Sequence, residues 1–320
     1  MMRPLPADFV HNIEHSFPKE GKAWLLALPS LLDEAASRWG LTLGKPFLLS
    51  YNYVCAAKSA DEADVVLKIG VPNPELTSEI ETLRLYDGHG AARLIDSDAE
   101  KGLLLEERLR PGTMLLTVRD DARATEIAAG LMCSLWRPPP AGNQFIRLEG
   151  WFDAFRELRQ RFDGGAGPFP KKMFETAERL VADFFSENEP PVVLHGDFHH
   201  YNVLKAGDEW KVIDPKGVIG PRGYEVGPLL INPFDDPSTG LRRERSDERS
   251  GQGRLRSPDA KSIIERRFAI LSEQLGMERS RIRGWGIAHA VLSSCWDMDE
   301  DGTGGEDTMR CAEVLMETRP

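Results

Sequence analysis

Residues 194–204 read LHGDFHHYNVL, and residues 212–217 read VIDPKG. Asp197 and Asn202 are five residues apart in the first stretch, and Asp214 follows in the second. Apolar residues flank these positions, and a Gly-Asp pair separates the two apolar runs as a tight turn would. We therefore predict two short strands joined by a hairpin, with the three polar side chains gathered at one edge.

These three side chains form the set that phosphoryl transfer requires. A carboxylate orients the attacking hydroxyl and accepts its proton, while an amide oxygen and a second carboxylate hold Mg²⁺ against the phosphates. The spacing Asp–x4–Asn, followed by Asp about a dozen residues later, is the arrangement of the protein-kinase catalytic loop and its metal-binding aspartate. A Gly-Asp turn alone is common and indicates only a turn, but the full set favours catalysis.

A second candidate feature lies nearer the N-terminus, where Lys68 stands inside the apolar run 65–69 (VVLKI). A lysine in such a strand is costly to bury unless it is paired. Its natural partners are nucleotide phosphates and a carboxylate of the following helix, which begins at Asn73-Pro74 and runs to about Tyr86. The alternative is an edge-strand lysine with its ammonium group in solvent.

The pattern of apolar residues divides the chain into two parts. Strand-like runs and one inserted helix occupy the first part, and helical periodicity dominates the second. We expect an α+β architecture divided into residues 1–109 and 110–320. The expected strands are 46–56, 63–69, 91–95 and 102–109, and the expected helices are 20–39, 74–86, 118–136, 150–163, 171–186, 259–276, 279–297 and a last one that runs to Arg319. Residues 235–258, dense in Gly, Ser, Arg and Asp, are predicted to form a flexible insertion.

The composition narrows the class of protein. The chain has 320 residues, a formal net charge of −11 and 41% hydrophobic residues, as a globular protein does. No apolar run approaches the roughly 20 residues that span a bilayer, and the N-terminus lacks the apolar core of a signal peptide. The acidic balance argues against general nucleic-acid binding. The four cysteines make no CxxC pair, so we expect reduced thiols and a cytoplasmic protein, with its oligomeric state left open.

The run LHGDFHHYNVL, followed by VIDPKGVIGPRGYEVGPLLINP, resembles the aminoglycoside phosphotransferase family, in its streptomycin 6-kinase and hydroxyurea-resistance kinase branch. In that branch a double histidine follows the catalytic aspartate, and DPKG replaces the DFG of protein kinases. The resemblance covers residues 20–232 and 259–302. It implies a protein-kinase-like, two-lobed fold with a small antiparallel-sheet N-lobe and a larger, mainly helical C-lobe. It also implies ATP- and Mg²⁺-dependent phosphorylation of a hydroxyl group on a small molecule.

The resemblance implies roles for individual residues. Asp197 would be the catalytic base, Asn202 and Asp214 would bind Mg²⁺, and His195 would hold the loop through its ring nitrogens. The expected nucleotide contacts are Lys68 with its ion-pair partner Glu79, the hinge residues Glu107 and Leu109, and Lys216. For the last of these, the alternative is a lysine exposed at the surface.

One departure concerns the loop that covers the phosphates in kinases. No glycine occurs between residues 46 and 69, where kinases have a glycine-rich loop. Ser50 and Asn52 are the candidates to hydrogen-bond the phosphates instead. The departure keeps open a second interpretation, a weakly active or non-catalytic nucleotide-binding homologue.

The acceptor must approach Asp197, so we expect its pocket in the helical lobe. An acidic cluster between residues 297 and 307 suits a cationic, hydroxylated small molecule such as an aminoglycoside. The candidate substrate contacts are His199, His200, Tyr224, Glu225, Trp296 and Asp297. For the two histidines the alternative is a purely structural role, and for Trp296 it is a place in the core. Another hydroxylated metabolite is an alternative acceptor, whereas the short segment after Asp214 disfavours a protein-serine kinase.

Overall fold

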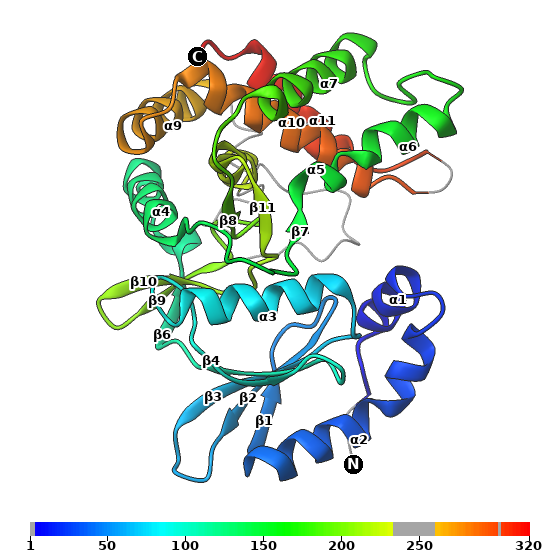
Figure 1. Cartoon of the computed structure of the whole chain (residues 1–320), viewed down its shortest axis with the longest axis vertical. Helices are drawn as coiled ribbons and strands as arrows, with labels where there is room; N and C mark the ends of the chain where they lie inside the picture. The colour runs from blue at the N-terminus through cyan, green and yellow to red at the C-terminus, as the bar shows by residue number, and fades with distance from the viewer. Residues whose placement is uncertain (1–3, 233–259, 300–301) are drawn as a thin grey trace.

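The computed structural model describes residues 4–232, 260–299 and 302–320, which form two lobes stacked one above the other (Figure 1). The predicted insertion at 235–258 lies outside the described residues. The proposed division near residue 110 falls between β5 (Leu103–Glu107) and β6 (Pro111–Met114).

The N-lobe is built on a five-stranded sheet in which every pair of neighbours is antiparallel. Its strand order is β1-β2-β3-β5-β4. The bounds are β1 Thr42–Pro46, β2 Tyr53–Lys58, β3 Asp64–Ile69 and β4 Leu94–Asp98, with β5 as given above. This arrangement confirms the small antiparallel sheet expected from the sequence.

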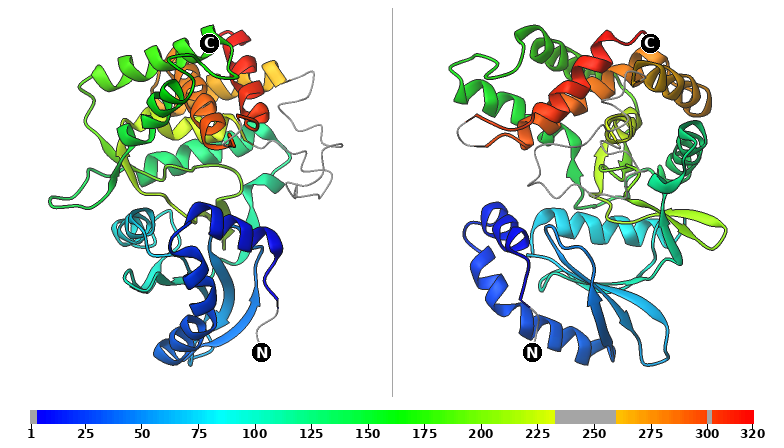
Figure 2. Two further views of the ribbon diagram at one scale, coloured as in Figure 1. Left: turned by 90° about the vertical axis from the view of Figure 1, so that its right-hand side faces the viewer. Right: turned by 180° about the vertical axis from the view of Figure 1, so that it is seen from behind.

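The two faces of this sheet pack against different partners. Because side chains alternate along a strand, Val65, Leu67 and Ile69 of β3 point to one face, where they are buried with α1 (Ala7–Ser16) and α2 (Gly21–Trp39). Those helices lie along one side of the sheet (Figure 2). Lys68 points to the opposite face, toward α3 (Pro74–Tyr86). Apolar burial stabilises both faces, since Leu104 on the Lys68 face is buried with Leu76 and Ile80 of α3, and Lys68 is a charged group within that packing.

Helix α3 joins the lobes and begins where the sequence predicts. The Asn73 side chain accepts a hydrogen bond from the Leu76 N–H at 3.0 Å, and Pro74 stands in the first turn. On its C-lobe side, the Ser78 hydroxyl donates to the Gly217 carbonyl. The same helix therefore contacts the sheet of one lobe and the metal-binding segment predicted in the other.

The C-lobe is mainly helical, and α10 (Arg279–Trp296) runs through its centre with Trp285 fully buried. The other helices have the bounds α4 Asp121–Leu135, α5 Leu148–Trp151, α6 Asp153–Arg161, α7 Lys171–Ser186, α8 Val226–Leu230, α9 Ala260–Leu275 and α11 Glu306–Glu317, with 3₁₀ turns at η1 Leu115–Thr117 and η2 Arg222–Glu225. The helices predicted at 171–186, 259–276 and 279–297 are confirmed within one residue at each end.

Two three-stranded sheets carry the candidate catalytic segments between the lobes. One has the order β10-β9-β6 and the other β7-β11-β8. Their remaining bounds are β7 Ile146–Arg147, β8 Val192–Leu194, β9 Val203–Ala206, β10 Glu209–Val212 and β11 Val218–Gly220. The predicted hairpin is present, since β9 and β10 pair antiparallel with Val203 opposite Val212.

Some expected elements are placed differently. The strand expected at 46–56 is wrong in its first half, because residues 47–52 form a loop and the strand runs over 53–58. Pro46 ends β1 because it has no N–H with which to continue the ladder. Helix α1 was not predicted from the sequence, and its Phe9 and Ile13 are fully buried against the rest of the N-lobe.

Two further expectations concern membrane-spanning helices and the state of the cysteines. No helix in the described part of the chain is long and apolar enough to cross a membrane. All four cysteines are free thiols.

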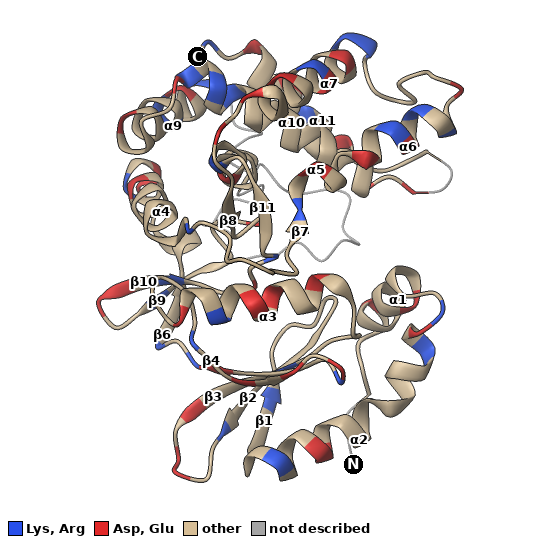
Figure 3. Cartoon of the chain, viewed as in Figure 1, with Lys and Arg blue, Asp and Glu red and all other residues tan. Residues whose placement is uncertain are grey.

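Acidic and basic residues are distributed over both lobes (Figure 3).

Candidate active site

The catalytic segment follows β8 and is fixed by His195, whose side chain is fully buried. The Asp197 N–H donates to His195 Nδ1 at 3.2 Å, so Nδ1 carries no proton, and Nε2–H donates to the Ile213 carbonyl at 2.9 Å. Burial lowers the pKa of His195 to about 4, in keeping with a neutral ring. The ring therefore ties the segment of Asp197 to the segment of Asp214, which is the structural role the resemblance implies.

Glu225 holds the same segment from beneath. Its carboxylate accepts hydrogen bonds from the His195 N–H at 2.8 Å and the Gly196 N–H at 2.9 Å. Burial raises its pKa to about 7. The hydroxyl group of the neighbouring Tyr224 is hydrogen-bonded to His289 Nδ1, and the two atoms are 2.9 Å apart. The side chains of Tyr224 and Glu225 are both fully buried beneath the loop, whereas the sequence led us to expect them at the substrate.

Asp197 is the carboxylate that the segment presents. Its side chain is 38% exposed, and its Oδ1 lies 3.3 Å from His199 Nε2. Asn202 Nδ2 donates to the Asp197 carbonyl at 3.0 Å and to Oδ2 at 3.3 Å. Partial burial opposes ionisation of Asp197, but the nearby His199 and Lys216 outweigh it and hold the pKa well below the usual range. The Asp197 carboxyl group is therefore ionised at neutral pH, and it can accept a proton from a hydroxyl group within hydrogen-bond distance.

Asn202 and Asp214 supply oxygen atoms suited to a hard divalent cation. The Asn202 amide nitrogen is turned toward Asp197, so these contacts do not use its amide oxygen. Asp214 has a φ of 57°, a left-handed conformation that non-glycine residues adopt rarely and that is often found at functional sites. Two protein oxygens fit Mg²⁺, which keeps waters and substrate phosphates among its ligands. No group of three or more His, Cys, Asp or Glu residues in the described segments offers a denser metal site.

Lys68 lies beside Asp214 and is 3% exposed. Its ammonium nitrogen is 2.5 Å from Glu79 Oε1 and 3.0 Å from Asp214 Oδ1. Burial opposes the charge on Lys68, but Asp214 and Glu79 more than offset it and raise the pKa of the ammonium group. The pairing of Lys68 with Glu79, rather than a solvent-exposed lysine, agrees with the expectation from sequence.

The other expected nucleotide contacts lie around this cluster at different depths. Lys216 is about half exposed, with its ammonium group 3.9 Å from a Glu75 oxygen, so it lies at the mouth of the site. Leu109 is 9% exposed, and its N–H has no hydrogen-bond acceptor among the described residues, as a base-binding hinge requires. Glu107 instead directs its carboxylate to Lys211 at 2.6 Å, so any contact with a base would come from its backbone.

Residues 47–52 form the loop that stands where kinases have a glycine-rich loop, and its two candidate phosphate contacts are Ser50 and Asn52. Ser50 is exposed, and its carbonyl accepts a hydrogen bond from Asn12 at 3.2 Å. The Asn52 side chain packs against Gly70, where a Cβ would overlap its amide oxygen. Within the described residues, neither side chain forms a hydrogen bond with Lys68.

An aromatic surface lies next to the catalytic segment. Trp296 is 49% exposed, and its ring stands edge to face with Trp151 at 5.4 Å. The Trp151 ring approaches Gly196 so closely that a Cβ there would lie 3.1 Å from it. Trp151 was missed in the sequence analysis, because its place beside Gly196 depends on how α5 packs. Asp297 directly follows Trp296 and is exposed, whereas His200 is 1% exposed.

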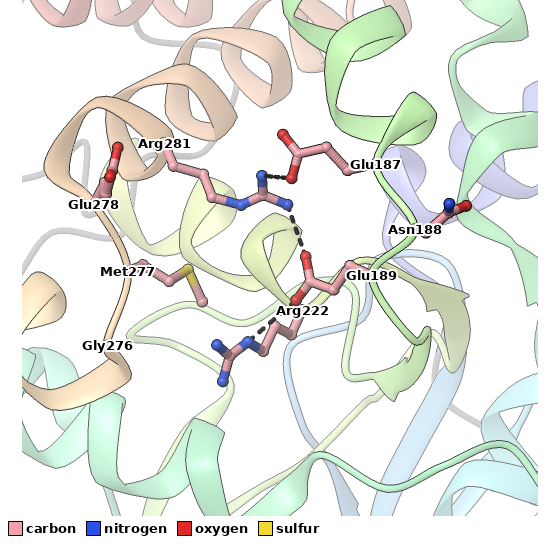
Figure 4. A pocket seen from close by; sticks show the side chains of 8 residues that line it. All are labelled: Glu187, Asn188, Glu189, Arg222, Gly276, Met277, Glu278 and Arg281. Atoms are coloured by element: carbon pink, nitrogen blue, oxygen red, sulfur yellow. Dashed lines mark hydrogen bonds and ion pairs between the residues drawn. The ribbon is translucent and has the colours of Figure 1, made fainter.

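A separate hollow lies on the C-lobe between the end of α7 and the start of α10 (Figure 4). Four of its charged side chains are paired with one another. Arg281 binds both Glu187 and Glu189, and Glu189 also accepts from Arg222 at 3.1 Å. It contains none of the predicted site residues.

Comparison with known proteins identifies the family. The chain matches the sequence model of the aminoglycoside/hydroxyurea antibiotic resistance kinases over residues 50–302. The chain belongs to this family. It is 31% identical over 310 residues to streptomycin 6-kinase of Streptomyces glaucescens, covering 95% of this chain and 93% of that protein. It is 29% identical over 323 residues to hydroxyurea phosphotransferase of Kitasatospora aureofaciens, covering 98% and 86%. The expected class of enzyme, a phosphotransferase, is thereby confirmed.

Solved structures of lower identity share the fold. Choline kinase of Streptococcus pneumoniae superposes with a TM-score of 0.60 at 13% identity, covering 90% of this chain and 99% of that one. An amicoumacin kinase solved with AMP-PNP and Ca²⁺ has a TM-score of 0.58 at 12% identity, covering 90% and 92%. The protein-kinase-like fold expected from the sequence is confirmed.

Proposed function

We propose that this kinase transfers the γ-phosphoryl group of ATP, with Mg²⁺, to a hydroxyl group of a cationic small molecule of the aminoglycoside class. The observation that carries the proposal is the approach of two groups of side chains, Glu79–Lys68–Asp214 and Asn202–Asp197. Their segments are joined by the Ile213 N–H, which donates to the Asn202 carbonyl at 2.9 Å. The amicoumacin kinase bound to AMP-PNP, a non-hydrolysable ATP analogue, supports the choice of nucleotide.

Each residue of the set has a defined task in the proposed reaction. Lys68, held by Glu79, binds the phosphates of the nucleotide as a fixed positive charge. Asn202 and Asp214 provide oxygen ligands for Mg²⁺, which when bound neutralises charge on the transferring phosphoryl group. Asp197 orients the acceptor hydroxyl and takes its proton as the new P–O bond forms and the bond from the γ-phosphorus to the leaving ADP breaks. The main contribution of the protein is thus positioning and charge stabilisation.

The acceptor is proposed to lie on the C-lobe side of Asp197. Trp296 and Trp151 offer aromatic faces there, and Asp297 offers a carboxylate for an amino or guanidino group. His199, at 3.3 Å from Asp197, lies near enough to contact the acceptor. Streptomycin is the first candidate because of the relative that phosphorylates it. The proposed location of the reaction is the cytoplasm, where ATP is available.

The test is a transfer assay with purified protein, labelled ATP and Mg²⁺ against streptomycin, hydroxyurea and a panel of other aminoglycosides and sugar alcohols. We expect transfer to at least one aminoglycoside. The matched variant is Asp197→Ala, which removes the base without touching the main-chain contacts of the loop. It should lower turnover by a factor on the order of 10²–10⁴ and leave the melting temperature unchanged.

Two results would contradict the proposal. Near-normal turnover by Asp197→Ala would show that the residue is not the base. Binding of ATP without transfer to any acceptor would favour the alternative of a non-catalytic nucleotide-binding protein.

A further inference from the structure

Glu106 is a buried carboxyl group that the proposed mechanism does not use. It is 5% exposed, and it stands at the end of β5 just before the expected hinge. In the part of the chain that the structure describes, it has no hydrogen-bond donor. A buried carboxyl without a donor is costly, and a donor supplied from outside the chain would lower that cost.

The register of the sheet places Glu106 on the face of Lys68. Lys68 lies opposite Leu104, and Val66 lies opposite Glu106, so all four side chains share one face. Val66 is half-buried, and it therefore leaves apolar surface open beside the carboxyl group. Glu106 is two residues further along β5 than Leu104, the partner of Lys68, and two residues of a strand span roughly 7 Å. A nucleotide whose phosphates reach Lys68 would thus extend its base toward Val66 and Glu106.

Lys68 does not need Glu106 as a counter-ion. Glu79 and Asp214 already contact the ammonium group at 2.5 and 3.0 Å, so a third carboxyl group adds negative charge without a direct pairing. Burial raises the pKa of Glu106 to about 8, and the nearby Glu79 and Asp214 add to the rise although Lys68 opposes it. An N–H donor from a ligand would relieve this cost.

We propose that the Glu106 carboxyl group accepts a hydrogen bond from the 6-amino group of adenine and makes the enzyme select ATP over nucleotides with a 6-oxo group. An adenine amine is a donor, whereas the 6-oxo oxygen of inosine or guanosine is an acceptor that faces the carboxylate unfavourably. The inference rests on the proposed use of a nucleotide but not on the identity of the phosphate acceptor.

The experiment is calorimetric titration of the full chain, at pH 8.5 so that the carboxyl group is ionised, with the Mg²⁺ complexes of ATP, ITP and purine riboside triphosphate. ITP carries the 6-oxo group, and purine riboside has no 6-substituent. The wild-type chain should bind ATP at least about tenfold more tightly than ITP, the equivalent of one hydrogen bond to a charged group. Purine riboside triphosphate should fall between them. This comparison needs no variant.

Glu106→Gln keeps the shape of the side chain but offers an N–H donor that can reach a 6-oxo oxygen. It should bring the ATP-to-ITP affinity ratio below about threefold, mainly through tighter ITP binding. Glu81→Gln is the matched control, because Glu81 lies on the outer part of α3 and pairs with Arg84. Its ratio should equal that of the wild type. The melting temperature of each variant is measured first.

The outcomes separate the two proposals. A wild-type ratio near one overturns the role of Glu106, and so does a ratio that Glu106→Gln leaves unchanged while ATP still binds. A merely structural role for Glu106 would weaken ATP and ITP binding equally and would also leave the ratio unchanged. If the wild-type chain binds none of the three nucleotides, the proposed function itself is overturned together with this inference.

Discussion

The pH dependence of stability offers a direct test of the role assigned to His195. Both ring nitrogens are engaged, Nδ1 by the Asp197 N–H and Nε2 by the Ile213 carbonyl, and the side chain is fully buried. Protonation of Nδ1 would place an N–H against the Asp197 N–H and would bury a charge. The folded protein therefore holds the neutral ring, whereas the unfolded chain accepts a proton freely below its ordinary pKa.

The sign and size of the effect follow from the two pKa values. The folded pKa of His195 is about 4 and its ordinary value is 6.5, so the unfolded state binds more protons between them. The contribution to stability is fully present above pH 6.5 and is lost as the pH falls toward 4. The total loss is about 3 kcal/mol, of which about 1 kcal/mol is already lost at pH 5.5.

The assay is urea denaturation of the wild type and of His195→Gln at pH 7.5 and pH 5.5. At pH 7.5 the variant should be less stable, because glutamine cannot reproduce both contacts of the ring. The gap between the two proteins should shrink by about 1 kcal/mol at pH 5.5, because only the wild type loses the His195 contribution. Comparing the two proteins cancels the titration of the other buried groups. A gap that is the same at both pH values, or larger at pH 5.5, would refute the reasoning.

Three further predictions concern separate contacts. Lys68→Met should lower turnover by at least about 10²-fold and weaken ATP binding in calorimetry, and unchanged ATP affinity would count against the phosphate role. Gly217→Ala should destabilise the protein by about 1–3 kcal/mol in urea, because the new Cβ would overlap the Thr82 hydroxyl at a residue with a φ of 65°, and wild-type stability would show that the segment adjusts freely. Asp121→Ala should cost about 3–5 kcal/mol, since it leaves the fully buried Arg267 guanidinium without the carboxylate that it contacts at 2.6 Å. A loss under about 1 kcal/mol, measured by the same denaturation, would contradict that last estimate.

Short-range patterns in the sequence predict much of the fold and of the site. The cap at Asn73 and the helix that follows depend on neighbouring residues, and so does the hairpin between Val203 and Val212. Asp197 and Asn202 belong to one loop, so their spacing alone brings them within 3.3 Å. Lys68 and Glu79 are eleven residues apart on a strand and the next helix, a distance over which local structure still determines contact. These features could therefore be predicted before any tertiary structure.

The boundaries and the support of the site required the tertiary structure. The apolar run at 46–56 does not reveal that Pro46 ends a strand, and nothing local predicts that α1 covers the sheet. Glu225 looks like a candidate substrate contact until the chain places it under the loop, where it binds the His195 and Gly196 N–H groups. Trp151 becomes a candidate site residue only because the packing of α5 places its ring against Gly196.

The sequence by itself thus determined the class of chemistry, because the residues proposed to perform it are recognised by type and by short spacing along the chain. Tertiary structure decided which of the remaining polar and aromatic side chains face the site and which are buried beneath it. Glu106 illustrates the difference. From the sequence, Glu106 is expected only to offer backbone groups at the hinge, and the sheet register is what places its side chain on the face of Lys68. Burial and contact between distant segments are properties of the packed chain, and no local pattern encodes them.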